Sequence, residues 1–556
     1  MPKITRRGAI FTSAALLGTA ATGCQNESLS TPVTFMHGVA SGDPTQNSII
    51  LWTRISPQDP NFSGSITGYW EVSTSKDFDK IVKKGKFTTS PTRDYTVKID
   101  AKDLKSGQTY YYRFKAGETF SPTGRTKVLP NGSLEKVRLA VVSCSNYPFG
   151  FFNIYDHIAK QDHFDAVIHL GDYFYEYGRD GYGGKVGAKL GREHEPAHEV
   201  ITLSDYRIRH AQYKGDPSTQ AMHTAHPLIA VWDDHETAND SWSTGAENHN
   251  ADEGSWDDRR TAAMQAYYEW MPVRDPQPGQ AREALFRNYE FGDLLSLTSI
   301  ETRLTARTRP IDYAHYISDL QTREGIGNFV QNILGDPTHE MMGEAQRDYV
   351  GKALKSSKDK KQPWRLIANQ VIMARTASPD LTAYKDEEFI KEIEKLFPQI
   401  YDYIALSPIG LPLNPDAWDG YPAARERFYK MATDQGVQDL LVLTGDTHDN
   451  WANKLESASG TTMGVELGVS GVTSPGTGAY FGSAGKDFSE RLNAKNPDIL
   501  YHDNQYHSYI DLSLTHEGGH AAFIGLDTIY SPEYKTSTIK EFKLVKHEDT
   551  IKLEEA

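Results

Sequence analysis

The chain has 556 residues, too many for one ordinary domain, so we expect at least two domains. Hydrophobic residues make up 38% and charged residues 24%, a composition typical of folded proteins that excludes a largely disordered chain. The formal net charge of −15 argues against nucleic acid as a binding partner, and any site for a phosphate group must supply its positive charge locally.

The first 24 residues are predicted to be an export signal. Residues 5–11 have the pattern of a twin-arginine signal, and the apolar stretch 9–22 is too short to span a bilayer. Cys24 resembles the lipidated cysteine of a lipobox, although Ala21 stands where leucine is usual. We expect export by the twin-arginine machinery to the periplasm or the exterior, with the membrane reached only through a lipid on Cys24. The alternative is a flexible cytoplasmic N-terminus.

Residues 34–130 are predicted to form a small β-sandwich. Strand patterns occur at 48–56, 68–73, 93–100 and 109–115, and helical patterns are nearly absent. The turn at 104–110 resembles the one that precedes a late strand in fibronectin type III modules.

From residue 137 to about 545, apolar strands alternate with helices, which predicts a layered α/β domain. Buried strands are expected at 137–143, 164–170, 228–232, 294–300, 364–369 and 440–444. Helices are expected at 152–160, 343–356 and 388–404, and strands return at 508–514 and 521–525. We expect mixed sheets with the helices on the outside.

The chain contains 2 cysteines, Cys24 and Cys144. If Cys24 is removed or lipidated, Cys144 has no disulfide partner in an oxidising compartment. Cys144 is then either buried and inert or a metal ligand.

Potential metal ligands follow most of the predicted core strands. The segments are Cys144-Ser145-Asn146, 171–176, 233–236, Asn369-Gln370 and 445–448. In open α/β sheets, ligands bind at the carboxyl ends of the strands. Each segment alone is equally well explained as a turn or a helix cap. Their recurrence with thiol, carboxylate, amide and imidazole groups predicts a metal site.

The motifs Gly171-Asp172, 233–236 (Asp-Asp-His-Glu) and 445–448 (Gly-Asp-Thr-His) resemble those of calcineurin-like metallophosphoesterases. The motifs resemble those of the alkaline phosphatase D (PhoD) family in particular, because Cys144 follows the first strand and Tyr175 stands three residues after Asp172. The resemblance covers about residues 34–530. It implies a layered α/β metallophosphoesterase core preceded by the fibronectin type III-like domain.

The resemblance implies iron (Fe³⁺) and calcium as cofactors. The implied ligands are Cys144, Asp172, Tyr175, Asp234, Asn369, Asp446 and His448. A thiolate and a phenolate suit ferric iron, with His448 beside them, whereas carboxylate and amide oxygens suit calcium. Asp172 would bridge two metals. The alternatives are a purely structural calcium site for the aspartates and simple core packing for Cys144 and Tyr175.

Two further residues are implied to be catalytic. His235 corresponds to a histidine that protonates the leaving oxygen; the alternative is a hydrogen bond to a metal ligand. Arg303 matches an Asp-Thr-Arg motif whose arginine grips phosphate, although Glu301 replaces the aspartate here.

The implied reaction is hydrolysis of phosphate monoesters, and of diesters as well, by attack of a metal-bound oxide or hydroxide on phosphorus. The main alternative is a phospholipase D-like or teichoic-acid phosphodiesterase on the same fold. A calcium-binding adhesin is the alternative from another class, and the cluster of ligands at strand ends argues against it.

Overall fold

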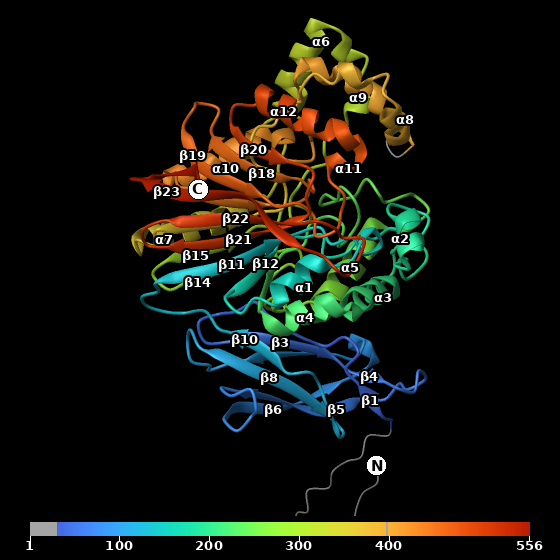
Figure 1. Cartoon of the computed structure of the whole chain (residues 1–556), viewed down its shortest axis with the longest axis vertical. Coiled ribbons are helices and arrows are strands. Elements are labelled where there is room, and N and C mark those ends of the chain that lie inside the picture. Colours follow the sequence, from blue (N-terminus) through green and yellow to red (C-terminus); the bar gives the residue numbers. More distant parts are fainter. Residues whose placement is uncertain (1–30, 396–398) are drawn as a thin grey trace, which may run out of the picture.

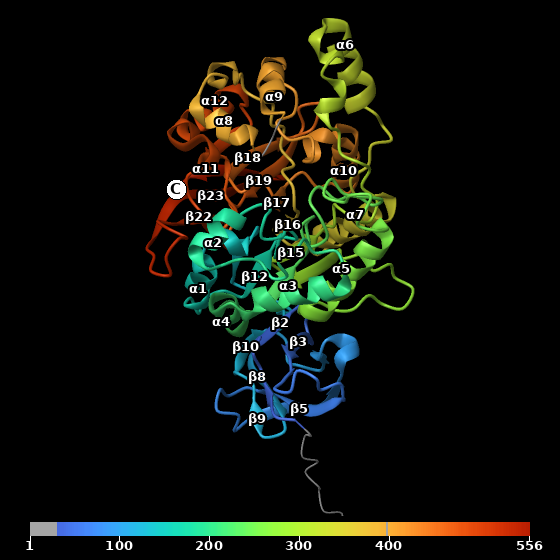
Figure 2. The same ribbon diagram turned by 90° about the vertical axis from the view of Figure 1, so that its right-hand side faces the viewer.

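The computed structural model describes residues 31–395 and 399–556, which form an N-terminal β domain and a larger layered domain (Figure 1). The predicted signal at 1–24, including Cys24, lies outside the described residues. Among the residues that are described, no helix has both the length and the hydropathy needed to cross a membrane. Figure 2 shows the N-terminal domain at one end of the molecule and a group of short helices at the other.

The N-terminal domain is an antiparallel β-sandwich, as the sequence predicts. One layer contains β2 (Val39–Gly42), β3 (Ile49–Arg54) and β7 (Thr96–Ala101). The other contains β10 (Gly124–Lys127), β8 (Thr109–Ala116), β5 (Ile66–Ser73) and β6 (Ile81–Thr89), in that order, with β9 (Thr119–Phe120) beside β8. The short strands β1 (Val33–Thr34) and β4 (Ser56–Pro57) pair with each other. Buried side chains from both layers, such as Leu51 and Phe114, share one apolar core.

Two large sheets form the centre of the second domain. The first has ten strands in the order β24-β23-β22-β21-β11-β12-β13-β2-β3-β7. Its remaining members are β11 (Lys136–Val142), β12 (Ala166–His169), β13 (Leu228–Ala230), β21 (Ser508–Thr515), β22 (Gly519–Leu526), β23 (Thr536–His547) and β24 (Thr550–Glu555). The strands β11, β12 and β13 are parallel, whereas β21 runs antiparallel to β11.

The second large sheet has seven strands in the order β14-β15-β16-β17-β19-β18-β20. They are β14 (Arg287–Phe291), β15 (Leu295–Ser299), β16 (Trp364–Ala368), β17 (Leu440–Thr444), β18 (Asn450–Glu456), β19 (Thr462–Gly468) and β20 (Ile499–Asp503). The strands β15, β16, β17 and β19 are parallel, β14 is antiparallel to β15, and β18 is antiparallel to both of its neighbours, β19 and β20. The expected mixed sheets are therefore confirmed.

Alternating side chains along the strands account for the layers. In β11, Leu139 and Val141 belong to the apolar core that both large sheets share, whereas Ala140 and Val142 belong to the core under the helices. Both sets are apolar, so the strand reads as a continuous apolar run rather than an alternating one. The centre of the ten-stranded sheet is thus buried on both faces.

Helices cover the outer faces of both large sheets. Side chains of α1 (Asn153–Ala159), α3 (Leu203–Gly215), α4 (Pro217–Ala225) and α5 (Trp256–Trp270) pack on the ten-stranded sheet. Those of α7 (Glu344–Asp359), α8 (Glu388–Glu394), α9 (Ile400–Leu406), α10 (Pro422–Asp434) and α12 (Gly485–Lys495) pack on the seven-stranded sheet. The other helices are α2 (Gly184–Leu190), α6 (Arg323–Asn328) and α11 (Thr477–Phe481). The single helix predicted at 388–404 is two helices, α8 and α9.

The two domains are joined at Gly42, where β2 pairs in parallel with β13 through Leu228. A Cβ atom on Gly42 would lie 2.5 Å from the carbonyl oxygen of Leu228 and 2.7 Å from that of Pro272. Asp43 follows, and its carboxylate accepts hydrogen bonds from the Arg274 amide (2.8 Å) and the Tyr289 hydroxyl (3.2 Å). The close approach of two backbones explains why glycine occupies position 42.

We predict that Gly42→Ala weakens this junction. The added methyl group has no room between the two carbonyl oxygens, so the free energy of unfolding should fall by about 1–3 kcal/mol. Gly215→Ala is the matched control, because a Cβ atom there meets nothing within 4 Å. Chemical denaturation of both variants measures the difference. Equal stability of the two variants would contradict the proposed steric role of Gly42.

Candidate functional site

The candidate site lies where the two large sheets meet at the carboxyl ends of their parallel strands. Ser143, just after β11, forms a parallel bridge with Gly471, just after β19. The Val472 amide donates to the Ser143 carbonyl at 2.9 Å, and the Ser474 hydroxyl donates to the Cys144 carbonyl at 2.9 Å. The loops after strands of both sheets are therefore held together by their backbones.

Several predicted ligands have left-handed backbone conformations. The φ angles are 59° at Cys144, 52° at Asp172, 63° at Asp446 and 61° at His448. Aspartate and histidine adopt this region more readily than most residues, but cysteine does not. Conformations of this kind cost about 1–3 kcal/mol each and are concentrated at functional sites.

The structure brings most of the predicted metal ligands together. Among the described residues, three groups of side chains could each hold a metal ion, and within each group all ligand atoms lie within 4.8 Å of one another. They are Cys144 with Asp172 and His448, Asp172 with Asp234 and His235, and Asp233 with Asp234 and Asp446. Asp172 is shared by the first two groups and Asp234 by the last two. The three groups therefore form one continuous chain of potential ligands.

The Tyr175 hydroxyl joins the first group. It lies 3.0 Å from Asp172 Oδ2, 3.0 Å from His448 Nε2 and 2.7 Å from the Ser474 hydroxyl. His448 Nδ1 donates to the Pro475 carbonyl at 3.1 Å, so Nε2 presents its lone pair to Tyr175. The single phenolic proton of Tyr175 cannot be donated to both Asp172 Oδ2 and His448 Nε2. The lone pairs that converge here therefore outnumber the available hydrogen-bond donors.

Two carboxylate oxygens of the site have no partner. Asp172 Oδ1 and Asp233 Oδ2 are buried and form no hydrogen bond to any described residue. The amide oxygen and nitrogen of Asn146, which follows Cys144 in the chain, are in the same condition. Buried polar atoms normally have partners, and buried carboxylates are normally paired or bind metals. The unpartnered oxygens fit bound cations.

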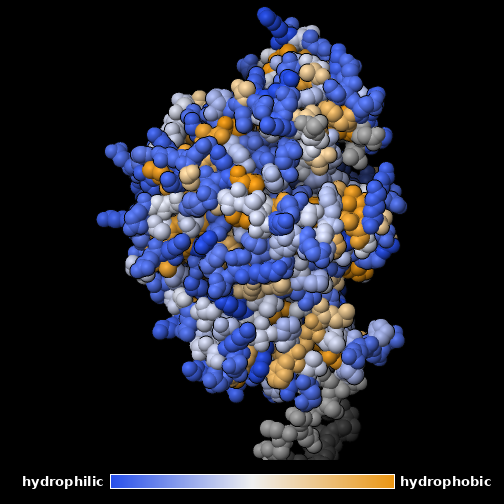
Figure 3. All heavy atoms as spheres, in the orientation of Figure 1, coloured by the Kyte–Doolittle hydropathy of each residue, from blue (hydrophilic) through white to orange (hydrophobic). Residues whose placement is uncertain are grey.

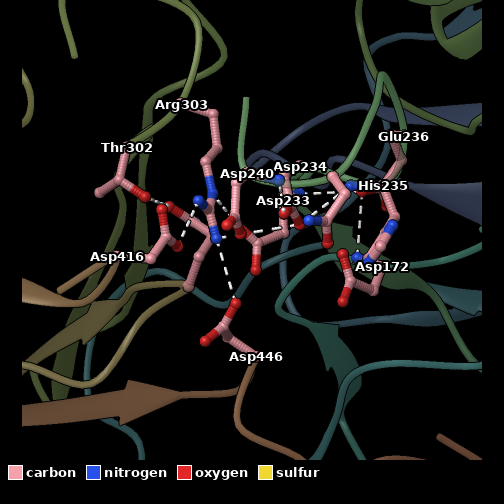
Figure 4. Close-up of polar contacts among 12 residues, drawn as sticks. Asp172, Asp233, Asp234, His235, Glu236, Asp240, Thr302, Arg303, Asp416 and Asp446 are labelled. Atoms are coloured by element: carbon pink, nitrogen blue, oxygen red, sulfur yellow. Dashed lines mark hydrogen bonds and ion pairs between the residues drawn. The ribbon is translucent and has the colours of Figure 1, made fainter. Parts of the chain in front are cut away.

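Arg303 lies among the carboxylates and is fully buried (Figure 4). Its Nε donates to Asp233 (2.5 Å), one terminal nitrogen to Asp416 (2.6 Å) and the other to Asp446 (3.1 Å). The Asp416 carboxylate also forms an ion pair with Arg307. All three nitrogens of Arg303 thus contact carboxylates of the chain, a role that the sequence motif did not suggest. Its contact with phosphate stays a prediction.

The carboxylates differ in their electrostatic surroundings. Burial raises the pKa of Asp233 to about 6, against the opposing effect of Arg303, and Asp234 adds to the increase. Burial also raises the pKa of Asp172 and that of Asp446 well above the usual range, with neighbouring aspartates contributing. At Asp234, Arg303 and His235 together outweigh burial and lower the pKa. The site is therefore short of positive charge.

Glu176 holds His235 in place. Its Oε2 accepts a hydrogen bond from His235 Nδ1 at 2.7 Å, and its Oε1 accepts from the Asn239 amide and the Asn248 side chain, both at 2.8 Å. The His235 ring also stacks at a tilt on Tyr175, with centroids 4.0 Å apart. Because Nδ1 is committed to Glu176, Nε2 is the atom of His235 that remains for other contacts. The sequence placed Glu176 in the right motif but gave it no role.

Glu236 links two loops of the site. Its carboxylate accepts hydrogen bonds from the amides of Asp172 (3.0 Å), Tyr173 (2.7 Å) and Asp233 (2.9 Å). The last residue of the Asp-Asp-His-Glu motif is thus a clamp between the loops that follow β12 and β13. Only a carboxylate with two accepting oxygens satisfies three amides at once.

Asn369 and Glu301 have structural partners. Asn369 is fully buried after β16, where its nitrogen donates to the Val371 carbonyl (2.6 Å) and its oxygen accepts from Trp418 (3.3 Å). Its role as a calcium ligand stays a prediction. Glu301 accepts from the Arg303 amide at 2.8 Å, so its extra methylene, compared with aspartate, still allows it to fix the backbone of Arg303. The sequence did not predict that Asp416 belongs to the site, because Asp416 lies in a loop with no strand directly before it.

Comparisons with known proteins identify the family of the chain. Residues 139–523 match the family described as PhoD-like phosphatase, and residues 19–130 match its N-terminal domain. Alkaline phosphatase D of Bacillus subtilis (strain 168) is 33% identical over 524 residues, which cover 91% of this chain and 80% of that protein. A solved structure of PhoD is 29% identical, with a TM-score of 0.76 over 93% of this chain and 92% of the other. The chain therefore belongs to the PhoD-like phosphatase family.

Proposed function

We propose that the protein hydrolyses phosphate esters at a site that holds more than one metal ion. The observation that carries the proposal is the continuous chain of ligands, in which Asp172 joins the Cys144–His448 group to the Asp234–His235 group. A carboxylate with two oxygens is suited to bridging cations. Membership of a phosphatase family supplies the reaction class.

The residues fit metal ions on three independent grounds. Asp172 Oδ1 and Asp233 Oδ2 are buried without partners, the Tyr175 hydroxyl faces two acceptors with one proton, and the carboxylates outnumber the positive groups around them. When bound, cations there would activate water as a nucleophile and neutralise negative charge on the phosphate group.

We infer iron for the first group and calcium for the carboxylates. Cys144 and Tyr175 supply the sulfur and phenolic oxygen that ferric iron prefers, and His448 Nε2 has its lone pair directed to the same place. The group formed by Asp233, Asp234 and Asp446 supplies only hard oxygen atoms, which suit calcium. Burial raises the pKa of Cys144 and that of Tyr175 well above the usual values, so both need a cation to ionise.

The chain's own residues would divide the remaining work. His235, fixed through Nδ1 by Glu176, would give the proton on Nε2 to the leaving oxygen. Arg303 would keep three carboxylates in place and, through its remaining N–H groups, contact an equatorial oxygen of the phosphate.

The export signal predicted at residues 1–24 suggests where the protein acts. An exported phosphatase would hydrolyse phosphate esters that lie outside the cytoplasm.

The proposed function is tested with 4-nitrophenyl phosphate and bis(4-nitrophenyl) phosphate. The purified protein should hydrolyse the monoester, lose activity on treatment with a chelator and regain it when calcium is returned. Faster turnover of the diester would assign a phosphodiesterase on the same fold. Full activity in protein that elemental analysis shows to be metal-free would contradict the proposal, and metal binding without any hydrolysis would favour the adhesin.

We predict that iron in the first group gives the protein a visible absorption band, because phenolate and thiolate ligands transfer charge into ferric iron. Tyr175→Phe keeps the ring but removes the oxygen, so the band should shift or fade while the fold survives; Cys144→Ser should lower iron retention. Tyr173→Phe is the matched control, since the Tyr173 hydroxyl contacts His223 rather than a ligand. Spectra and iron content unchanged in both ligand variants would show that Tyr175 and Cys144 are core packing.

We predict that His235→Ala reduces kcat about 10²- to 10⁴-fold while metal content stays near that of the wild type. A proton donor acts in the transition state, whereas a ligand holds the metal in the ground state. His448→Ala provides the contrast, with metal and activity expected to fall together. If His235→Ala also loses metal in proportion to activity, His235 is a ligand and not the acid.

A further inference from the structure

A cavity of about 340 Å³ lies next to the candidate site on the side of the seven-stranded sheet. Asp446 and Thr447, from the loop after β17, line one part of it. Most of the rest is apolar and comes from α8, α9, α11, α12 and nearby loops, including Leu381, Ile390, Ile404 and Phe488. On the face in Figure 3, apolar side chains also reach the surface around α8 and α9. The proposed function leaves this cavity unused.

Several polar groups of the lining are already bonded to the chain. Trp451 Nε1 donates to the Thr447 hydroxyl at 2.8 Å, and the Tyr403 hydroxyl donates to the Leu413 carbonyl at 2.9 Å. The hydroxyl of Tyr480 pairs with that of Tyr182 at 2.9 Å. A sugar or another polyol in the cavity would lose its hydrogen bonds to water and gain few in return. The lining therefore selects an apolar group.

The size of the cavity favours a chain over a ring. An engineered cavity of about 150 Å³ holds benzene, so one aromatic ring would fill less than half of the space here. An unbranched alkyl chain can extend until it fills the volume. Because Asp446 belongs both to the ligand group and to the cavity wall, the alkyl chain of an ester bound at the ligands can extend into the cavity.

We propose that the cavity binds the alkyl chain of a phosphate ester whose phosphate group occupies the site of Asp172, Asp234 and Asp446. The proposal rests on the proposed function and narrows its substrates to alkyl phosphate esters. Each methylene that enters the cavity leaves water, which contributes to binding without altering the reacting atoms.

The test uses alkyl phosphates from ethyl to octyl, with release of phosphate as the readout. The acidity of the leaving alcohol is nearly constant in this series, so chain length changes only the apolar contact. We expect kcat/KM to rise about fourfold per methylene until the cavity is full. A parallel series of alkyl 4-nitrophenyl diesters covers a phosphodiesterase.

Octyl phosphate and 2-phenylethyl phosphate both have eight carbons on an aliphatic alcohol, so their comparison separates chain from ring. Preference for octyl supports the alkyl assignment, and equal or reversed preference overturns it. Values of kcat/KM that do not change with chain length, in protein that hydrolyses ethyl phosphate, also overturn it. Absence of hydrolysis of every ester instead refutes the proposed function.

Ile393→Trp shortens the cavity, since the half-buried Ile393 lines it. We expect the octyl-to-ethyl ratio of kcat/KM to fall at least tenfold. Ile326→Trp in α6, also half-buried but outside the cavity lining, should keep the wild-type ratio. Leu413→Gln is a second lining variant that adds a polar group instead of bulk. Wild-type ratios in both lining variants would overturn the proposal.

Discussion

The main physical constraint on the candidate site is the electrostatic repulsion among its buried carboxylates. Only nearby positive charge can offset that repulsion. Asp233, Asp416 and Asp446 each receive one nitrogen of Arg303, and two carboxylate oxygens remain without partners. Much of the surrounding structure serves to hold these groups together against that repulsion. Glu236 ties the loops after β12 and β13, and Ser474 ties the loop after β19 to Cys144. Buried carboxylates that outnumber the positive side chains around them are typical of sites that bind metal cations.

Most of the fold was predictable because each buried strand is a continuous apolar run that ends at a polar residue. The expected strands at 137–143, 364–369 and 440–444 correspond to β11, β16 and β17, and the chain reverses after each of them at a predicted ligand. What the sequence could not show was the pairing of strands far apart in the chain. The extension of the ten-stranded sheet by β2, β3 and β7 rests on a close backbone contact at Gly42, which leaves no pattern in hydropathy.

The sequence predicted which residues lie together at the candidate site, but it predicted fewer of the contacts that support them. Asp172, Asp234 and His448 stand at strand ends, where the rule for open sheets finds them. Asp416 comes from a loop and meets Arg303 only through the tertiary fold, so no local signal marks it. The split of 388–404 into α8 and α9 was missed for a different reason, because the sequence has Pro398 inside that range and a proline within a helical pattern normally ends or kinks the helix.

The pairing of β11 with β21 has a consequence for how the protein is made. Residues 136–141 of β11 pair with residues 510–515 of β21, so the strand that precedes Cys144 is synthesised long before its neighbour in the sheet. Contacts between such distant segments form slowly and only after the intervening chain is available. The candidate site therefore cannot form fully until β21 has been synthesised, and a chain interrupted anywhere before β21 lacks the partner strand that holds Cys144 in register.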